Sequence, residues 1–457
     1  MKLFVWCCLA VSSLLVAALA ASAETRPQYG GRLRVAMHAT PTSIDPADAT
    51  QADSFARRNL SMLMFDTLVT NDEHGRLQPS LATSWQSAPG NQRWQFRLRH
   101  GVKFHDGTPL TAEAAATSLR AANPAWKVSA DGDLLILELE TSNPELPAEL
   151  ALPRNAIVKR NDGGRTSGTG PFHIVDWQPG KTLALAAEEM HWRGRPFLDA
   201  IEVEMGKSER DQMLALESGR TDLVEVGAEQ AHRVSLEGRR LASSAPVELL
   251  TLVFARDVQS PDEKLLRDAL ALSVDRGSIR SVLLQGAGQS AGGVLPTWIS
   301  GYEFVFPTEA DLSRARRERE QVRSAATWTL GYDGNDPLAR LIAERIALNA
   351  KDAGLSLRPT PAATADVRLV RIALTSVDPW IALANIATAV GASVPSRGSI
   401  SIEDLYATEQ SVLAMQRVIP LVHLPASYAA STSLKNWVVR ANGSLNLGDA
   451  WMGSGKP

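Results

Sequence analysis

The chain has 457 residues, of which 44% are hydrophobic and 21% are charged, and its formal net charge is -3. This length predicts two or three domains, and this composition excludes a wholly disordered chain. The small net charge argues against nucleic acid as a partner, because binding a polyanion favours a strongly basic surface.

The first residues, 1–23, are predicted to be a signal peptide. An apolar stretch runs from residue 3 to residue 20, and the small residues "ASA" at 21–23 fit a cleavage site. Both cysteines, Cys7 and Cys8, lie inside this segment. The mature chain is therefore expected to lack disulfides, thiolate metal sites and a cysteine nucleophile. We expect a soluble, exported, periplasmic protein without a lipid anchor.

The first part of the mature chain combines short predicted strands with helices. Apolar residues alternate over 32–38, 94–98 and 134–139, which predicts strands. Helical spacing from Phe55 to Leu68 predicts a helix. Residues 150–170 are rich in glycine and small polar residues, which predicts a crossing between lobes.

A polar turn follows the second of these strands. His100, His105 and Asp106 could form a metal site or an acid/base pair. The two histidines are five positions apart with Gly101 between them, which is not the helical spacing of a zinc motif. The sequence favours a tight turn followed by a helix capped by Thr111.

The later part of the chain predicts a hairpin and then a helix-rich region. "QPGK" is a turn signal between the strands around it, and the helix after it ends at Gly219. Residues 261–284 read as one helix. Asp336 is the predicted N-cap of a helix between two strands, and this βαβ order predicts a largely parallel sheet. The Arg/Glu run at 313–323 reads as a solvated helix with pairs such as Arg314 with Glu318.

Catalytic motifs are missing from the sequence. There is no G-x-S-x-G nucleophile elbow, and "GTG" at 168–170 is too short for a phosphate-binding loop. Two compatible interpretations of "GTG" remain, a flexible crossing between lobes and a strand edge that lines a ligand cleft.

Seven stretches, in order, resemble the family 5 extracellular solute-binding proteins, the peptide- and nickel-binding receptors of ATP-driven importers. The stretches are "GGRLRVAMHATPTSIDPA", "MFDTLVTNDEHGRLQPSLATSW", "WQFRLRHGVKFHDGTPLTAEAAATSL", "GTGPFHIVDWQPGKTLALAAEEMHWRGRPFLDAIEVEM", "LRDALALSVDRGSI", "YDGNDPLARLIAERIALNAKDAGLSLRP" and "IPLVHLPASYAASTSLKNW". They cover nearly the whole mature chain.

The resemblance implies an α/β fold, a two-lobe periplasmic-binding-protein clamp of type II, similar to cluster C, with mixed sheets. It implies a discontinuous lobe I (24–60, 168–255 and 425–457), a small inserted domain (61–167) and a lobe II (256–424). A ligand would be enclosed between the lobes by hinge closure.

Ten residues are candidates for lining this cleft. Three follow the first strand, where clefts of open α/β sheets tend to lie, and the others are positions that the resemblance implies. The candidates are Thr40, Thr42, Ser43, Gly168, Thr169, Gly170, Thr375, Ser376, Asp378 and Trp380.

The resemblance also implies where a peptide's amino terminus would bind. Peptide-binding members place an acidic residue three positions before an acid-Pro or Asn-Pro pair. Here that position is Thr375, so the ammonium anchor is missing, unless Asp378 takes its place. The alternative for Asp378 is an Asp-Pro turn, and the sequence slightly favours it. His423 could contribute to a metal chelate but is better explained as a core histidine.

The expected function is that of a periplasmic substrate-binding protein of an ABC transporter. We expect a monomer that is not an enzyme, with no cofactor and no metal, whose partners are a small ligand, most simply a peptide, and the membrane permease with its ATPase. The alternatives are a sensor or receptor that is not coupled to transport, and a binder of a metal chelate or an oligosaccharide.

Overall fold

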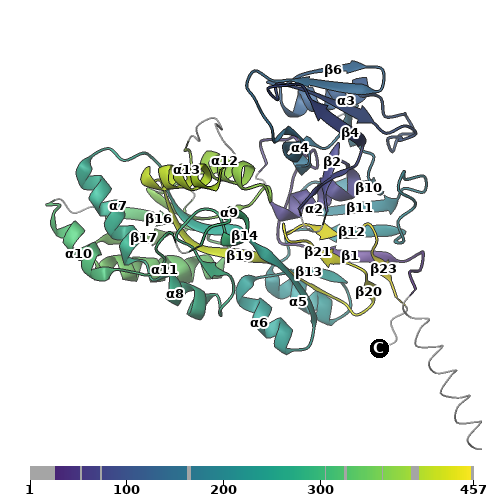
Figure 1. Cartoon of the computed structure of the whole chain (residues 1–457). Helices are drawn as coiled ribbons and strands as arrows, with labels where there is room; N and C mark the ends of the chain where they lie inside the picture. Colours follow the sequence, from purple (N-terminus) through teal and green to yellow (C-terminus); the bar gives the residue numbers. More distant parts are fainter. Residues whose placement is uncertain are drawn as a thin grey trace, which may run out of the picture.

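The computed structural model describes residues 26–51, 54–72, 75–161, 166–303, 305–323, 327–362, 364–392 and 401–453. The predicted signal peptide and both cysteines lie outside these residues. Two lobes stand side by side, and a smaller domain sits at one end of the molecule above lobe I (Figure 1). This is the α/β clamp with mixed sheets that the sequence predicts.

The described residues build one 11-stranded mixed sheet that runs through both lobes. From edge to edge the strands are β10 (Phe172–Gln178), β11 (Thr182–Ala187), β12 (Ala200–Glu204), β1 (Arg32–Ala36), β13 (Leu223–Val226), β19 (Val418–Ala430), β14 (Arg240–Phe254), β18 (Val367–Ala373), β16 (Thr327–Gly331) and β17 (Ser356–Thr360), with β15 (Gln289–Ser290) paired to β19.

Strands β14 and β19 connect the lobes. The start of β14 pairs with Ser427–Ala430 of β19, which also pair with β13 of lobe I. Beyond an irregularity at Pro246, β14 pairs with the rest of β19 and with β18 of lobe II. The prediction of a largely parallel sheet in the later part of the chain is wrong, because the strands that connect the lobes pair in antiparallel fashion. Only β16 pairs in parallel there, with β17 and β18, whereas the connecting strands are antiparallel.

The helices of both lobes begin at polar N-caps in most cases, as the sequence led us to expect. Ser54 accepts a hydrogen bond from the backbone of α2, and Asp336 accepts two from α11. The pair Arg314 with Glu318 is confirmed at 2.8 Å. The helices are α2 (Phe55–Met64), α5 (Glu209–Glu217), α6 (Ala228–Leu236), α7 (Pro261–Ser273), α8 (Arg276–Ser278), the π-helix η2 (Ile279–Leu283), α9 (Thr297–Ser300), α10 (Leu312–Glu320), α11 (Pro337–Asp352), α12 (Pro379–Ala389) and α13 (Ile402–Ala414).

The single helix predicted over residues 261–284 is interrupted. The chain is extended at Val274, and the side chain of Asp275 accepts a hydrogen bond from Ser278 to begin α8. An Asp that caps locally competes with continuation of a helix, which explains the break.

The inserted domain is a four-stranded antiparallel sheet covered by one helix. Its sheet has the order β4-β5-β7-β6, and Thr111 caps the helix as predicted. The elements are β4 (Ala82–Ser87), β5 (Arg93–Leu98), α3 (Ala112–Ala122), β6 (Lys127–Asp131), β7 (Leu134–Glu138), α4 (Leu146–Glu149) and the 3-10 helix η1 (Pro153–Asn155). Paired short strands complete the molecule: β2 (Val69–Asn71) with β3 (Leu77–Pro79), β8 (Lys159–Arg160) with β9 (Thr166–Ser167), β20 (Leu434–Lys435) with β23 (Trp451–Met452), and β21 (Val438–Val439) with β22 (Leu445–Asn446).

Separate groups of buried apolar residues lie in each part of the molecule. One gathers around Phe172 and Trp437 in lobe I, another around Phe96 in the inserted domain, and two more occupy lobe II. The predicted boundaries of the three units remain predictions. The described chain contains no helix that is both long and apolar enough to cross a bilayer.

Candidate ligand-binding cleft

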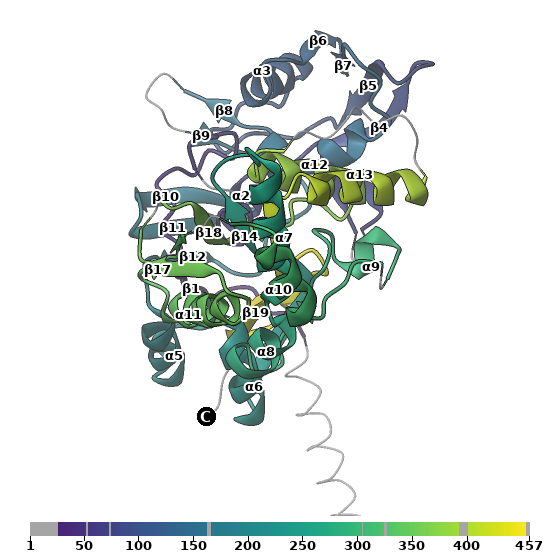
Figure 2. The same cartoon turned by 90° about the vertical axis from the view of Figure 1, so that its left-hand side faces the viewer.

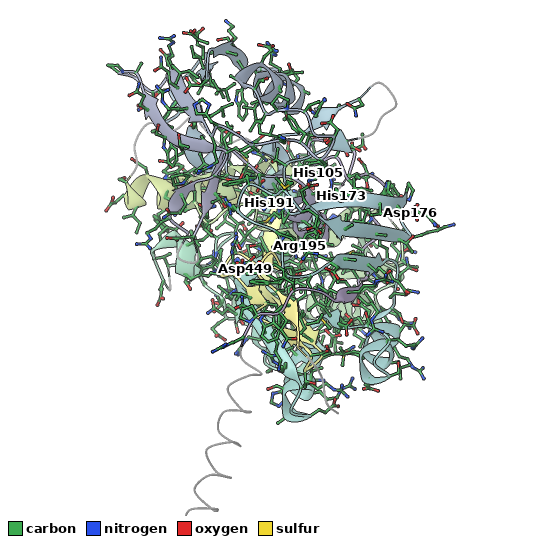
Figure 3. The ribbon with its side chains drawn as sticks, turned by 90° about the vertical axis from the view of Figure 1, so that its right-hand side faces the viewer. His105, His173, Asp176, His191, Arg195 and Asp449 are labelled. Atoms are coloured by element: carbon green, nitrogen blue, oxygen red, sulfur yellow. The ribbon has the colours of Figure 1, made fainter. Side chains whose placement is uncertain are left out.

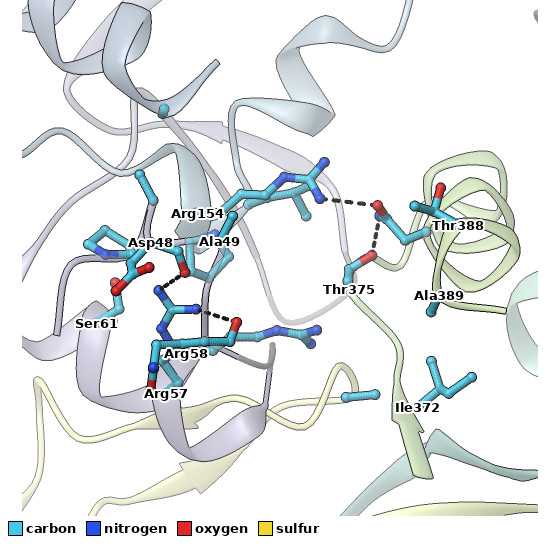
Figure 4. Close-up of a pocket in the computed structure, with 18 of the residues that line it drawn as sticks. Asp48, Ala49, Arg57, Arg58, Ser61, Arg154, Ile372, Thr375, Thr388 and Ala389 are labelled. Carbon is cyan, nitrogen blue, oxygen red and sulfur yellow. Dashed lines mark hydrogen bonds between the residues drawn. The ribbon is translucent and has the colours of Figure 1, made fainter. Parts of the chain in front are cut away.

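A cavity of about 600 Å³ lies where the three parts of the molecule meet (Figure 4). Its size is within the usual range for small-ligand sites. Lobe I contributes the loop before α2 and one face of α2, the inserted domain contributes the chain at η1, and lobe II contributes β18 and α12. The lining residues are Pro46, Ala47, Asp48, Ala49, Gln51, Arg57, Arg58, Ser61, Ala122, Leu152, Pro153, Arg154, Arg371, Ile372, Ala373, Thr375, Asn385, Thr388 and Ala389.

Direct hydrogen bonds cross the cavity. The guanidinium of Arg58, on α2, donates to the backbone carbonyl of Leu374 in lobe II. The guanidinium of Arg154 donates to Asn385 Oδ1 at 3.1 Å, and Asn385 Nδ2 donates to Thr375 Oγ1. Seen from lobe II, α12 lies directly beneath the inserted domain (Figure 2). The lobes are therefore in contact around the cavity, in a closed arrangement.

Arg57 shapes the loop that forms one wall. Its guanidinium donates to the carbonyls of Asp45, Asp48 and Gln51, at 2.6, 2.7 and 3.1 Å. Asp45 in turn accepts two hydrogen bonds from Arg160, at 2.6 and 2.7 Å. A loop rich in Pro, Asp and Ala thus keeps a fixed shape through side chains that reach its backbone.

The predicted residues that follow β1 support this loop and are not among the residues lining the cavity. Thr42 N donates to the side chain of Gln51 at 3.2 Å, and Ser43 Oγ accepts from Asp45 N at 3.3 Å. Thr40 lies beside Gly180 and Gly206, in turns of lobe I. Their role in ligand binding remains a prediction.

The "GTG" segment packs against the end of α2. Gly170 N donates to Met64 O at 3.0 Å, and Thr169 Oγ1 donates to Asp66 at 2.9 Å. A Cβ at Gly168 would overlap the carbonyl of Met64. The described contacts of Gly168, Thr169 and Gly170 are thus packing contacts, and none of the three lines the cavity.

The four predicted residues at 375–380 have different surroundings. Thr375 lines the cavity, and Ser376 Oγ accepts from Asp378 N at 3.0 Å. Asp378 Oδ1 accepts from Trp380 N and Ile381 N at 3.0 and 2.9 Å, so this carboxylate is the N-cap of α12. Trp380 packs beside the lobe II core. Of the ten candidates, only Thr375 lines this cavity.

The described histidines do not gather into a metal site. His105 accepts a hydrogen bond from Gly168 N and its Nε2 lies 2.9 Å from Gly170 O, so its ring links the turn to the "GTG" segment. Burial lowers the pKa of His105, which favours this neutral form. His105, His173 and His191 are in the same region in Figure 3, but the described residues contain no cluster of three potential metal ligands.

Asp106 and His423 also have structural partners. Burial alone would raise the pKa of Asp106, but hydrogen bonds from Lys159 and Thr108 outweigh it and lower the pKa to about 2. His423 is buried, and its Nε2 lies 3.1 Å from Val294 O. Burial lowers the pKa of His423 to about 4. The interpretation of His423 as a core histidine is confirmed.

The sequence did not identify the polar residues that dominate the cavity: Arg57, Arg58, Ser61, Arg154 and Asn385. The adjacent arginines on α2 were the one available signal. Arg58 is only 9% exposed, and a cation is rarely so buried without a specific reason.

The family is decided by a match over residues 76–371 to the model described as "Bacterial extracellular solute-binding proteins, family 5 Middle". The chain belongs to this family. The resemblance stated from sequence motifs is confirmed.

Relatives and solved structures agree with this assignment. The chain is 25% identical over 330 residues to the probable D,D-dipeptide-binding periplasmic protein DdpA of Escherichia coli, covering 65% of this chain and 64% of that protein. DppA from Helicobacter pylori, solved with the peptide STSA, matches with a TM-score of 0.81 and 18% identity over 94% of this chain and 99% of that one. AgaA from A. tumefaciens R10, solved with agropinic acid, matches at 0.77 and 18% over 93% and 99%.

The sequence matches to the first curated relatives span less than two thirds of those proteins. These relatives include periplasmic binding proteins and receptors for peptides and nickel, not enzymes. The prediction that this chain is not an enzyme is therefore confirmed, whereas its ligand and transport partners belong to the proposal below.

Proposed function

We propose that this protein captures a small ligand between its two lobes in the periplasm and delivers it to the permease and ATPase of an ABC importer. The observation that carries the proposal is the cavity of about 600 Å³ whose walls come from both lobes and the inserted domain. A ligand that contacts all three parts binds the closed state more tightly than the open one, so it shifts the population toward closure.

The two connecting strands support a hinge at the base of the cleft. The pairing of β14 with β19 is irregular between Ser243 and Glu248, at the point where β14 passes from lobe I to lobe II. Irregular pairing there lets the two halves of the sheet rotate with few broken hydrogen bonds. A permease that recognises both lobes would then distinguish the closed, loaded protein from the open one.

The ligands named for structurally similar proteins, a peptide for DppA and agropinic acid for AgaA, differ in chemistry. This supports a small-ligand clamp without deciding which ligand it holds. A peptide is the first expectation from sequence.

The proposal is tested by native mass spectrometry of the exported protein, followed by transport assays. We expect a co-purified small molecule that is lost on unfolding and that rebinds with a decrease in the radius of gyration in solution scattering. Membrane vesicles that contain the cognate permease and ATPase should hydrolyse ATP faster when the loaded protein is added. Closure without stimulation of the ATPase would instead support a sensor.

A further inference from the structure

The cavity has an uneven distribution of charge. Arg57, Arg58, Arg154 and Arg371 all line it, and among the described lining residues Asp48 is the one carboxylate. Asp48 Oδ1 accepts hydrogen bonds from the backbone and hydroxyl of Thr50, at 2.9 and 2.6 Å, and these bonds lower its pKa. Asp48 therefore stays ionised, with one oxygen turned toward its own loop.

Two of the arginines have carboxylate partners outside the lining. Arg371 lies 3.6 Å from Glu248 and 3.5 Å from Asp336, and Arg154 lies 3.6 Å from Glu149. Arg57 differs, because the groups that accept its hydrogen bonds are three backbone carbonyls, and Asp48 interacts with it through charge alone. A carbonyl satisfies an N–H group but does not neutralise the charge of a guanidinium.

One face of α2 presents buried donors that lack an acceptor. Among the described residues, Arg57 Nε and Ser61 Oγ are buried and have no hydrogen-bond partner. The two residues are four positions apart, so they are neighbours on the same helix face. Ser61 is 3% exposed and lines the cavity, and both residues are drawn on one side of it in Figure 4. Leaving buried donors unsatisfied costs free energy, which a ligand with an acceptor group would recover.

The backbone of α2 also favours a negatively charged group in the cavity. Helix α2 has ten residues, begins beside the cavity and has no acidic residue in its first turn. The partial positive charge at a helix N-terminus therefore acts in the same direction as Arg57.

The opposite wall does not suit an ammonium group. Thr375 stands where the peptide-binding resemblance implies a carboxylate, and its Oγ1 accepts from Asn385. Asn385 Oδ1 accepts from the cationic Arg154. An ammonium group at this wall would meet the like charge of Arg154, and none of the described residues that line this wall is acidic.

We infer that the ligand is a small carboxylic acid whose carboxylate binds Arg57 and Ser61 on α2, and that its recognition requires no ammonium group. The inference rests on the proposed function, because it concerns the ligand of the same cleft. A singly charged carboxylate fits better than a phosphate dianion, because the ionised Asp48 shares the wall and repels the greater charge more strongly.

Calorimetry on the exported protein, unfolded to release ligand and refolded, tests this inference with three probes. They are N-acetyl-trialanine, which has a carboxylate and no ammonium group, trialanine amide, which has the reverse, and inorganic phosphate. We expect N-acetyl-trialanine to bind at least tenfold more tightly than either of the others.

Variants then locate the subsite. Ser61→Ala should weaken N-acetyl-trialanine about tenfold, the loss expected for one hydrogen bond to a charged group. Ser411→Ala is the matched control, because Ser411 is not among the lining residues and its hydroxyl donates to Thr408 O on its own helix. Circular dichroism and melting temperatures establish that both variants fold.

The outcomes separate the inference from the proposed function. Tighter binding of the amide, tighter binding of phosphate, binding of none of the three, or an unchanged affinity in Ser61→Ala would each overturn the carboxylate subsite. A co-purified ligand in native mass spectrometry would still support a small-ligand clamp in those cases. Absence of any ligand and of closure would count against the clamp itself.

Discussion

At the scale of single residues, two neighbouring acids face lobe II from lobe I. Glu209 starts α5 and Glu229 lies in the first turn of α6. Burial, then the charge and hydrogen bond of Glu229, then Asp336, raise the pKa of Glu209 to about 7, against an opposing effect of Arg371. Gln230 Nε2 donates to Glu209 at 2.7 Å. A carboxyl with a raised pKa binds its proton more tightly in the folded state than in the unfolded chain.

The pH dependence of stability follows from this shift. The folded state is penalised once Glu209 ionises, so stability falls as the pH rises from about 4.5 to about 7. Glu209→Gln should raise the melting temperature at pH 8 by about 2 °C, for an effect that solvent screening limits to about 1 kcal/mol. The gain should vanish near pH 4.5.

Glu229→Gln is the comparison for this prediction. It removes the repulsion but not the burial of Glu209, so its gain should be smaller than that of Glu209→Gln, and the double variant should gain little over Glu209→Gln. Calorimetric melting curves at several pH values provide the measurement. An equal gain for Glu209→Gln at pH 4.5 and pH 8 would show that charge is not the cause.

Asp378 gives a second prediction at this scale, because the sequence left open an anchor for a ligand cation or a turn. Its Oδ1 caps α12. Asparagine caps a helix about as well as aspartate, so Asp378→Asn should leave both stability and ligand affinity unchanged, whereas Asp378→Ala should cost about 1 kcal/mol of stability. Chemical denaturation and calorimetry measure the two quantities. Weaker ligand binding by Asp378→Asn with unchanged stability would restore the anchor hypothesis.

The sequence predicted the role of a single residue correctly where the groups that it contacts are close to it in the chain. Thr111 and Asp336 cap the helices that their positions predicted. Arg58 and Ser61 were not recognised, because the carbonyl that Arg58 reaches is 316 positions away and the helical pattern says nothing of a cavity. The pair Asp336 with Arg371 is hidden for the same reason.

At the scale of elements, the connecting strands show the same limit. The end of β14 has the apolar sequence of a buried strand, whereas residues 240–246 have a polar, irregular pattern and form a strand through their pairing with β19. The family resemblance, by contrast, predicted the two-lobe fold without any pairing information. The order of the motifs was therefore sufficient to predict the two-lobe architecture. The strand directions, by contrast, depend on pairing between residues that are far apart in the chain.

The packing of the "GTG" segment against α2 leads to a prediction about stability. Gly168 has no positive φ, so an added Cβ is costly only because the carbonyl of Met64 and the ring of Phe65 occupy its place. Gly168→Ala should therefore reduce the free energy of unfolding by about 1–3 kcal/mol, the usual cost of overpacking. Gly448→Ala, where Asn446 Oδ1 would lie 3.6 Å from the added Cβ, is the control and should change stability little. Unchanged stability of Gly168→Ala in urea denaturation would indicate that the segment can move away from α2.

At the scale of the whole molecule, direct hydrogen bonds between its parts support the closed arrangement. Arg154 from the inserted domain and Asn385 from α12 share a hydrogen bond at 3.1 Å across the cavity, and Arg58 reaches Leu374 on the same side. Such contacts stabilise the closed state with or without a ligand. The balance between open and closed forms therefore responds to single side chains at this rim.

Asn385→Ala tests this dependence of closure on the rim. Removing one hydrogen bond to a charged group should shift the ligand-free protein toward the open form and weaken ligand binding by about tenfold. Solution scattering should show a larger radius of gyration without ligand, and the value of the unsubstituted protein once ligand is saturating. A direct loss of ligand contact alone would lower affinity without changing the ligand-free radius, so the two measurements together distinguish a closure contact from a binding contact. Thr388→Ala, one turn further along α12, should change neither.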